Sequence, residues 1–210
     1  MNFNFFKHLH TVNKHRFKVF KNSFKVGIPF QGLMHDLSKY SYREFNKSIK
    51  YYNGHYSPIL NERLNEGLYS SCFVHHTNKN KHHYEHYIDF YKGDLLLPKI
   101  PYKYSLEYVI DVISASQTYL GKNFNKEEPL KYFIAHSSTS LMHSMNIEYI
   151  KKLLTIYNEK GFKGLKKKYT KSLYLELSKD YPNTELIKCY SLNNKFEKVL
   201  LNDEEIKKYK

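Results

Sequence analysis

The sequence predicts an all-α fold, and two observations support this prediction. Apolar residues recur at helical spacing in long segments such as 3–24, 105–120 and 146–159. Glycine and proline fall between the periodic segments, where helices are expected to end. A chain of 210 residues that is 41% hydrophobic has enough apolar material for one sizeable domain. We therefore expect a helical domain over residues 1–165, followed by a basic C-terminal extension over residues 166–210.

The helices can be placed in order from their apolar periodicity and their capping residues. Ser41 and Glu44 form a capping box, which gives Glu44 a structural role. Ser105 is expected to cap a later helix, with Glu107 in its first turn. Residues 93–104 are expected to be irregular, and the pattern beyond residue 180 is weak. The expected helices cover residues 3–24, 31–39, 41–52, 68–76, 82–91, 105–120, 130–136, 146–159 and 165–175.

The formal net charge of +14 favours anionic partners, namely phosphorylated small molecules, nucleic acid or acidic surfaces. Much of this charge lies in the C-terminal third, from Lys163 to Lys171 and from Lys207 to Lys210. A bias toward Lys, Asn, Tyr and Ile is also typical of AT-rich coding sequence, which accounts for part of the charge without any function. Nucleic acid is therefore one candidate partner of the basic surface.

Cysteine usage and hydropathy bear on the compartment. Cys72 and Cys189 are far apart and have no metal-ligand spacing. Lys7 and Lys14 interrupt the aromatic N-terminus before a signal-peptide core can form. No apolar run approaches the roughly 20 residues that a membrane span needs. We expect a cytoplasmic protein with free thiols and without a membrane partner.

The segment Gln31–Lys39 contains the most unusual pair of residues in the chain. His35 and Asp36 are adjacent, with Leu33, Met34 and Leu37 around them. Burying an imidazole or a carboxylate costs free energy unless the group is paired or bound to a metal. On a helix, neighbouring residues point about 100° apart, so both reach one ion only if it lies against the groove between them.

Further histidines and one aspartate accompany this pair. His15 shares the apolar stripe of its helix with Val12 and Val19, so it is expected to face inward. The simplest alternative to a metal ligand at this position is a core histidine bonded to a carbonyl. Five histidines fall between His75 and His86, a density that also fits a solvated basic patch. Asp111 lies in a strongly hydrophobic stretch; taken alone it is expected to be exposed, and the histidines in the same chain favour a metal-binding role instead.

In chain order these candidates form a series of ligands, each on its own helix or helix end. The series resembles the HD-domain superfamily of metal-dependent phosphohydrolases, whose core is a helical bundle and whose minimal motif is His, His-Asp and Asp. That resemblance assigns the motif to His15, His35, Asp36 and Asp111. It assigns the additional histidines of two-metal members, and of the related inositol oxygenase, to His76 and to His82 or His83.

A closer resemblance is to a small family of HD-like proteins catalogued as a domain of unknown function. The matching phrases are His8 to His15, Gln31 to Ser41 and His75 to His86, with a looser match from Asp111 to Gly121. This resemblance covers about residues 5–125 and implies no substrate. The choices between His75 and His76, and between His82 and His83, stay open.

The resemblance implies a metal-dependent phosphohydrolase acting on a nucleotide or another small phosphorylated molecule. Mixed imidazole and carboxylate ligands suit one or two ions of Mn, Fe, Co, Ni or Zn. Asp36 would orient the attacking water, and Lys39 would contact phosphate, helped by Arg16 or Lys81. Glu85 is either a general acid or base or an exposed helix residue. Alternative functions are a non-catalytic nucleic-acid-binding protein and a dinuclear iron oxygenase. The predicted metal ligands are His15, His35, Asp36, His76, His83 and Asp111.

Overall fold

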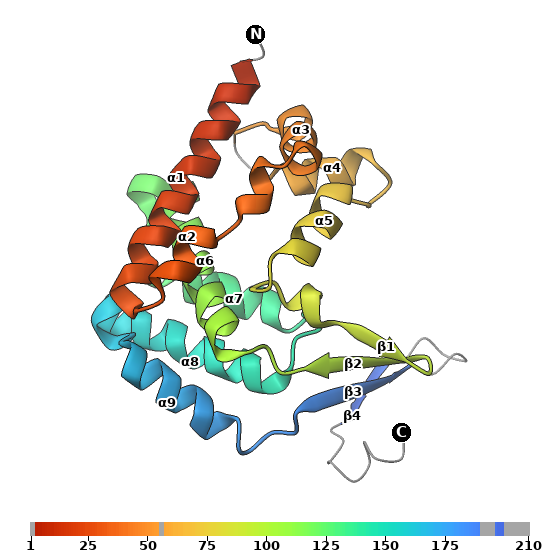
Figure 1. The fold of residues 1–210 in the computed structure, drawn as a ribbon, viewed down its shortest axis with the longest axis vertical. Coiled ribbons are helices and arrows are strands. Elements are labelled where there is room, and N and C mark those ends of the chain that lie inside the picture. The colour runs from red at the N-terminus through yellow and green to blue at the C-terminus, as the bar shows by residue number, and fades with distance from the viewer. Residues whose placement is uncertain (1–2, 55–56, 190–195, 200–210) are drawn as a thin grey trace.

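The computed structural model describes residues 3–54, 57–189 and 196–199 and is predominantly helical, as the sequence predicts (Figure 1). Short 3₁₀ turns occur at Leu37–Tyr40, Tyr84–Tyr87, Gly121–Asn123 and Gly161–Gly164. The α-helices are α1 (Phe3–Val26), α2 (Pro29–Met34), α3 (Tyr42–Tyr51), α4 (Pro58–Asn65), α5 (Ser71–Lys79), α6 (Tyr102–Leu120), α7 (Glu128–Ser137), α8 (Ser144–Lys160) and α9 (Lys167–Leu177).

Helix α6 runs through the middle of the molecule and contacts α1, α7, α8 and α9 (Figure 1). Leu106, Val109, Ile110 and Ile113 on this helix are completely buried, as expected for a core helix with apolar residues three and four apart. Neighbouring helices add their own buried stripes, including Val19 of α1. A polar side chain on the buried face of α6 therefore has little access to solvent. Asp111 lies on this helix, so its carboxylate needs polar partners within the protein.

A small antiparallel sheet flanks the helices, in the order β1-β2-β3-β4. Its strands are β1 (Asp89–Tyr91), β2 (Asp94–Pro98), β3 (Thr184–Cys189) and β4 (Phe196–Val199). The predicted helix over residues 82–91 is therefore wrong, as is the irregular structure predicted for residues 93–104. Buried Leu95 and Leu97 alternate along β2, and Leu95 pairs with Ile187. That partner is too distant in sequence for local periodicity to reveal it.

The start of α6 also differs from the prediction. The helix begins at Tyr102, directly after Pro101, so Ser105 lies one turn inside it instead of at its cap. The Ser105 hydroxyl donates to the carbonyl of Ile100 at 3.0 Å. The predicted cap of α3 is confirmed, because the Ser41 hydroxyl accepts a hydrogen bond from the backbone N–H of Glu44.

The described part of the C-terminal extension packs against the helical body. Leu173 and Leu177 of α9 belong to the main hydrophobic core, and the Tyr174 hydroxyl donates to the carbonyl of Ile100 at 2.7 Å. Strand β3 extends the sheet formed by β1 and β2. The run Lys207 to Lys210 lies outside the described residues.

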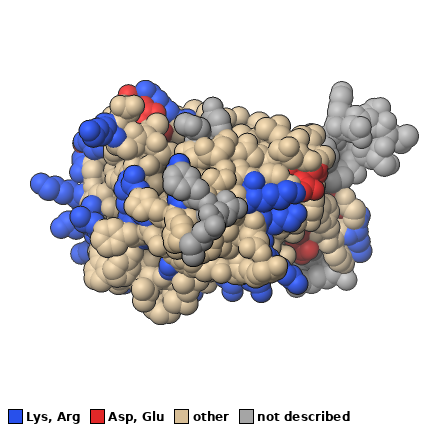
Figure 2. Space-filling view, turned by 90° about the horizontal axis from the view of Figure 1, so that it is seen from above, with Lys and Arg blue, Asp and Glu red and all other residues tan. Residues whose placement is uncertain are grey.

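The surface is rich in basic side chains. Figure 2 shows Lys and Arg spread over the face seen from above, with few acidic side chains among them. Within the described ranges, none of the helices combines the length and apolar character needed to cross a membrane.

Candidate metal centre

The His35-Asp36 pair lies in a turn, which corrects the helix predicted for residues 31–39. Helix α2 ends at Met34, His35 lies in the turn that follows, and Asp36 has a φ of +52° in the left-handed region. Aspartate adopts this region more readily than most residues with a side chain. The turn changes the relative direction of the two side chains, so that both enter the same buried space. Their Nε2 and Oδ2 atoms are 3.2 Å apart.

Close packing of α2 on α1 fixes the position of this turn. A Cβ atom at Gly32 would lie 2.5 Å from Cβ of Ser23, so the helices approach closely because residue 32 has no side chain. Arg16 of α1 then donates to the carbonyls of His35 and Leu33 at 2.7 and 2.8 Å. Arg16, which the sequence suggested as a phosphate contact, thus anchors the turn and lines a different hollow from that of Lys39.

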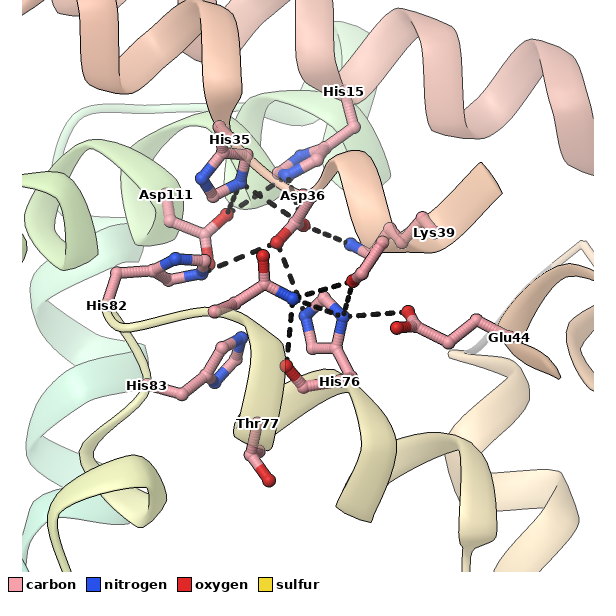
Figure 3. Close-up of polar contacts among 12 residues, drawn as sticks. His15, His35, Asp36, Lys39, Glu44, His76, Thr77, His82, His83 and Asp111 are labelled. Atoms are coloured by element: carbon pink, nitrogen blue, oxygen red, sulfur yellow. Dashed lines mark hydrogen bonds and ion pairs between the residues drawn. The ribbon is translucent and has the colours of Figure 1, made fainter. Parts of the chain in front are cut away.

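One oxygen of Asp36 meets side chains from the N-terminal half of the site (Figure 3). Oδ2 lies 3.2 Å from Nε2 of His35 and 4.0 Å from Nε2 of His15 on α1. The Nζ atom of Lys39, from the following 3₁₀ turn, lies 2.6 Å from the same oxygen. All three contacts join residues that the sequence had assigned to the centre.

The other oxygen of Asp36 meets histidines from α5 and the turn after it. Oδ1 lies 3.3 Å from Nε2 of His76 and 3.6 Å from Nε2 of His82. Asn80, at the end of α5, donates to Ser38 Oγ and to the His76 carbonyl, which ties this turn to the Asp36 segment. Asp36 therefore stands between two groups of imidazoles.

Asp111 of α6 closes the cluster on the opposite side. Its Oδ1 lies 3.0 Å from Nε2 of His15 and 3.4 Å from Nε2 of His35. Its Oδ2 lies 3.8 Å from Nε2 of His82. The carboxylate of Asp111 therefore faces inward, and the exposed position expected from Asp111 alone is wrong.

The donor atoms form groups compact enough to hold a metal ion. There are three such groups among the described residues, and within each the candidate ligand atoms lie within 4.8 Å of one another. One contains Asp36, His76, His82 and His83, a second contains His15, His35 and Asp111, and a third, which overlaps both, contains His35, His82 and Glu107. All six sequence-predicted ligands are thus brought together, and His82 joins His83. His75 is directed to Glu44 instead, through Nδ1 at 2.8 Å from Oε1.

Two buried glutamates contact the Nδ1 atoms of three candidate ligand histidines. Oε1 of Glu107 lies 3.0 Å from Nδ1 of His35 and 3.3 Å from Nδ1 of His82. Glu44 Oε2 lies 2.9 Å from Nδ1 of His76. In each of these three histidines, the glutamate meets Nδ1 while Nε2 faces the Asp36 or Asp111 carboxylate. Such contacts fix the tautomer and the ring orientation of a ligand histidine.

Sequence reasoning gave both glutamates a role at a helix start and missed these contacts. Glu44 does lie in the first turn of α3, but its buried carboxylate serves His75 and His76. Glu107 precedes Asp111 by one helical turn, so both occupy the same face of α6. The four-residue spacing from Asp111, within a strongly apolar helix, could have indicated that Glu107 also faces the cluster.

The charges around the cluster strongly perturb its pKa values. Burial alone would raise the pKa of Asp36, but His35 and Lys39 hold it well below its usual range. Burial would lower the pKa of His35, yet the neighbouring carboxylates, led by Asp36, raise it well above its ordinary value. The pKa of His83 is lowered well below its ordinary value by burial and by His82 and His76. The carboxylates around His35 thus favour a positive charge at this position. A protonated imidazole supplies that charge, and a bound metal cation would supply it as well.

The residues present fit a divalent metal. His35 Nε2, Asp36 Oδ1 and His82 Nε2 are buried and have no hydrogen-bond partner among the described residues. Leaving such groups unsatisfied costs about 1–3 kcal/mol each, and coordination would remove that cost. Imidazole nitrogens and carboxylate oxygens together suit Mn, Fe, Co, Ni or Zn.

A cavity of about 490 Å³ opens onto the cluster, which we call the Lys39 cavity. Cys72 also lines it, but burial raises the pKa of this thiol to about 11, and no metal-binding group found among the described residues contains it. Lys81 is exposed and lines a different cavity, beside Lys79 and Lys103. Residues lining the Lys39 cavity include His8, His10, Lys14, His15, Asp36, Lys39, His76, His83 and Asp111.

Together, fold and site define a helical protein with a buried His/Asp/Glu cluster suited to a divalent metal. The chain belongs to the family of unknown function DUF5662, whose sequence profile matches residues 4–156. This match includes every candidate ligand and both supporting glutamates. A search of curated proteins found no match, and a search of solved structures found none either.

Proposed function

We propose that this protein is a metal-dependent phosphohydrolase that acts on a nucleotide or another small phosphorylated molecule. The observation that carries the proposal is the position of Asp36. Its two oxygens face separate groups of histidines, and Lys39 lies 2.6 Å away beside an open cavity. The order of these residues along the chain resembles that of HD-domain phosphohydrolases, which supports the same reaction class.

The ligands fall into two sets that share Asp36. His15, His35 and Asp111 would hold one ion with Asp36, and His76, His82 and His83 would hold a second. A bound divalent ion of this kind makes water more acidic and neutralises charge on phosphate oxygens. Two sets of donors favour the two-ion alternative over a single ion.

The side chains of the chain itself account for phosphate binding. The ammonium of Lys39 has three donors, and Asp36 occupies one direction, which leaves others for phosphate oxygens. Lys14 lies at the same cavity and adds positive potential for an anion. Burial lowers the pKa of His8 to about 4, so this histidine is neutral near pH 7 and contributes no such charge.

Phosphate release tests the proposal. Metal-loaded protein is incubated with a panel of nucleotides and sugar phosphates, with Mn or Co added. We expect release by the wild type, loss of bound metal and of release in His35→Ala, and retention of both in His86→Ala. His86 is a half-buried histidine of the same region, and its Nδ1 contacts the carbonyl of Thr77. No release from any phosphate ester would overturn the proposal, and oxygen consumption by iron-loaded protein would favour the oxygenase instead.

A specific surface supports the nucleic-acid alternative as a second candidate. Lys166, Lys167, Lys168 and Lys171 are exposed at the start and in the first half of α9. Replacing these four lysines with glutamine tests this role better than truncation, because Leu173 and Leu177 of α9 are part of the core. If the surface binds nucleic acid, affinity falls steeply with salt in the wild type and is lost in the variant.

A further inference from the structure

A second cavity lies next to the Lys39 cavity, and we propose that it binds a planar aromatic or heterocyclic ring of the substrate. This inference rests on the proposed function. It narrows the substrate class to phosphate monoesters whose alcohol part carries such a ring, with a hydrogen-bonding group on the ring edge. We call this second space the tyrosine cavity, after the residues that line it.

The tyrosine cavity has a volume of about 710 Å³, within the usual range for small-molecule sites. It shares His83, Asp111 and Tyr119 with the lining of the Lys39 cavity. Both spaces therefore meet at the candidate metal centre. A molecule with its phosphate at that centre can extend its other end into the tyrosine cavity.

The two cavities have different walls. The Lys39 cavity contains the charged groups of the metal centre, including two ammonium groups that can contact an anion. Its charged side chains are Lys14, Lys39, Asp36, Glu44 and Asp111. The walls of the tyrosine cavity are aromatic, and they come mainly from α6, α7 and the turn after α5. Aromatic faces bind planar rings by stacking, which tolerates variation in the ring itself. The aromatic residues of this cavity are Phe73, Tyr84, Tyr108, Tyr119, Tyr132 and Phe133.

Glu85 and Arg63 are among the charged side chains that give the aromatic space a hydrogen-bonding capacity. Glu85 lines the tyrosine cavity, and its Oε2 makes no hydrogen bond among the described residues, although it lies 3.8 Å from Nδ1 of His83. It is half-buried in a 3₁₀ turn, so the exposed helix glutamate expected from the sequence is wrong. Arg63 lines the same cavity, with its guanidinium 4.4 Å from the ring centre of Phe73. A carboxylate and a guanidinium suit a ring whose edge carries both a donor and an acceptor.

A matched pair of substrates tests the inference. Ribose 5-phosphate and the nucleoside 5′-monophosphates share the sugar phosphate and differ in the ring. We expect kcat/KM for the preferred nucleotide to exceed that for ribose 5-phosphate at least tenfold. In Tyr132→Ala that ratio falls at least tenfold, and Glu85→Gln changes the order of preference among the four bases. Tyr169→Ala is the control, because Tyr169 is an exposed tyrosine on α9, and its ratio stays that of the wild type.

Binding of unphosphorylated nucleosides separates this inference from the proposed function. Calorimetric titration of the full chain with adenosine, guanosine, cytidine and uridine needs no turnover. Saturable binding that Tyr132→Ala weakens at least tenfold supports the tyrosine cavity even if no phosphate ester is hydrolysed. The inference is overturned if none of the nucleosides binds and ribose 5-phosphate is hydrolysed as efficiently as the nucleotides. Absence of nucleoside binding in a protein without hydrolytic activity would overturn it as well.

Discussion

Oε1 of Glu107 lies 3.0 Å from Nδ1 of His35, on the side of the imidazole opposite Nε2, which faces Asp36 at 3.2 Å. The same carboxylate oxygen reaches Nδ1 of His82 at 3.3 Å. Glu107 therefore sets the tautomer of two candidate ligands from a position one turn before Asp111. Its charge is retained in this buried place, because contacts with His35 and His82 lower the pKa of Glu107 although burial raises it.

Replacing Glu107 with glutamine tests this positioning role. The Glu107→Gln variant keeps the size of the side chain but loses the negative charge behind both histidines. We expect metal affinity to fall by about 10- to 100-fold, the usual effect of losing such a supporting contact. Competition with a chromogenic chelator measures the change. Glu148→Gln is the control on the surface of α8, and equal affinities in the two variants would contradict the assignment.

Lys39 and Lys81 give a paired test of phosphate binding. Lys39 lines the cavity at the metal centre, whereas Lys81 is exposed beside a different cavity. We expect Lys39→Met to retain bound metal and to lower kcat/KM for a phosphate ester at least tenfold, because one charge-assisted contact is lost. Steady-state kinetics with metal analysis of the same samples provides the measurement. A comparable loss in Lys81→Met would show that Lys81, as the sequence suggested, also contacts the substrate.

Gly32 has a packing role that can be tested through stability. A methyl group at this position would meet Ser23 and the Cα of Phe20, so α2 would have to move away from α1. We expect Gly32→Ala to destabilise the protein by about 1–3 kcal/mol, the typical cost of overpacking. Urea unfolding gives the free energy of unfolding. Gly121→Ala is not a suitable control, because the φ of Gly121 is +54° and alanine would be strained there whatever the packing. An unchanged free energy of unfolding in Gly32→Ala would refute the close packing of α2 on α1.

Bound metal should stabilise the folded protein, because the ligands come together from α1, the turn after α2, α5, the turn after α5, and α6. An ion that binds the folded state alone adds about 2.7 kcal/mol when its concentration is 100 times its Kd. We therefore expect a chelator to lower Tm by several degrees and added Mn, Co or Zn to restore it. Differential scanning calorimetry measures both steps. If neither chelator nor added metal changes the Tm, the cluster is a hydrogen-bonded network of the core and not a metal site.

Local pattern was sufficient for much of this fold and indicated several of the candidate ligands. The seven-residue spacing of Val12 and Val19 located the buried face of α1, and His15 followed from it. The unusual composition of Gln31–Lys39 identified His35 and Asp36. Neither inference required a distant contact, since each rested on neighbours along a single segment.

What the sequence did not reveal depends on contacts between distant segments or on backbone geometry. The left-handed conformation of Asp36 replaces a helix by a turn, and no periodicity predicts it. Strand β2 pairs locally with β1 through the turn at Lys92 and Gly93, and its other edge pairs with β3, whose Ile187 lies opposite Leu95. The second pairing joins segments too far apart in sequence for a local pattern to reveal. The glutamates were assigned to helix starts because that role is local, whereas their contacts with histidines form only after α3, α5 and α6 have packed together.

The metal content of the untreated protein is the decisive test of whether the His/Asp cluster binds a metal. The protein is purified without chelator and without added metal, and first-row transition metals are measured by inductively coupled plasma mass spectrometry. We expect about one to two equivalents of such a metal per chain, and a loss of most of it in Asp36→Asn. Less than about 0.1 equivalent in the wild type, with no uptake on exposure to Mn, Fe, Co, Ni or Zn, would contradict this expectation.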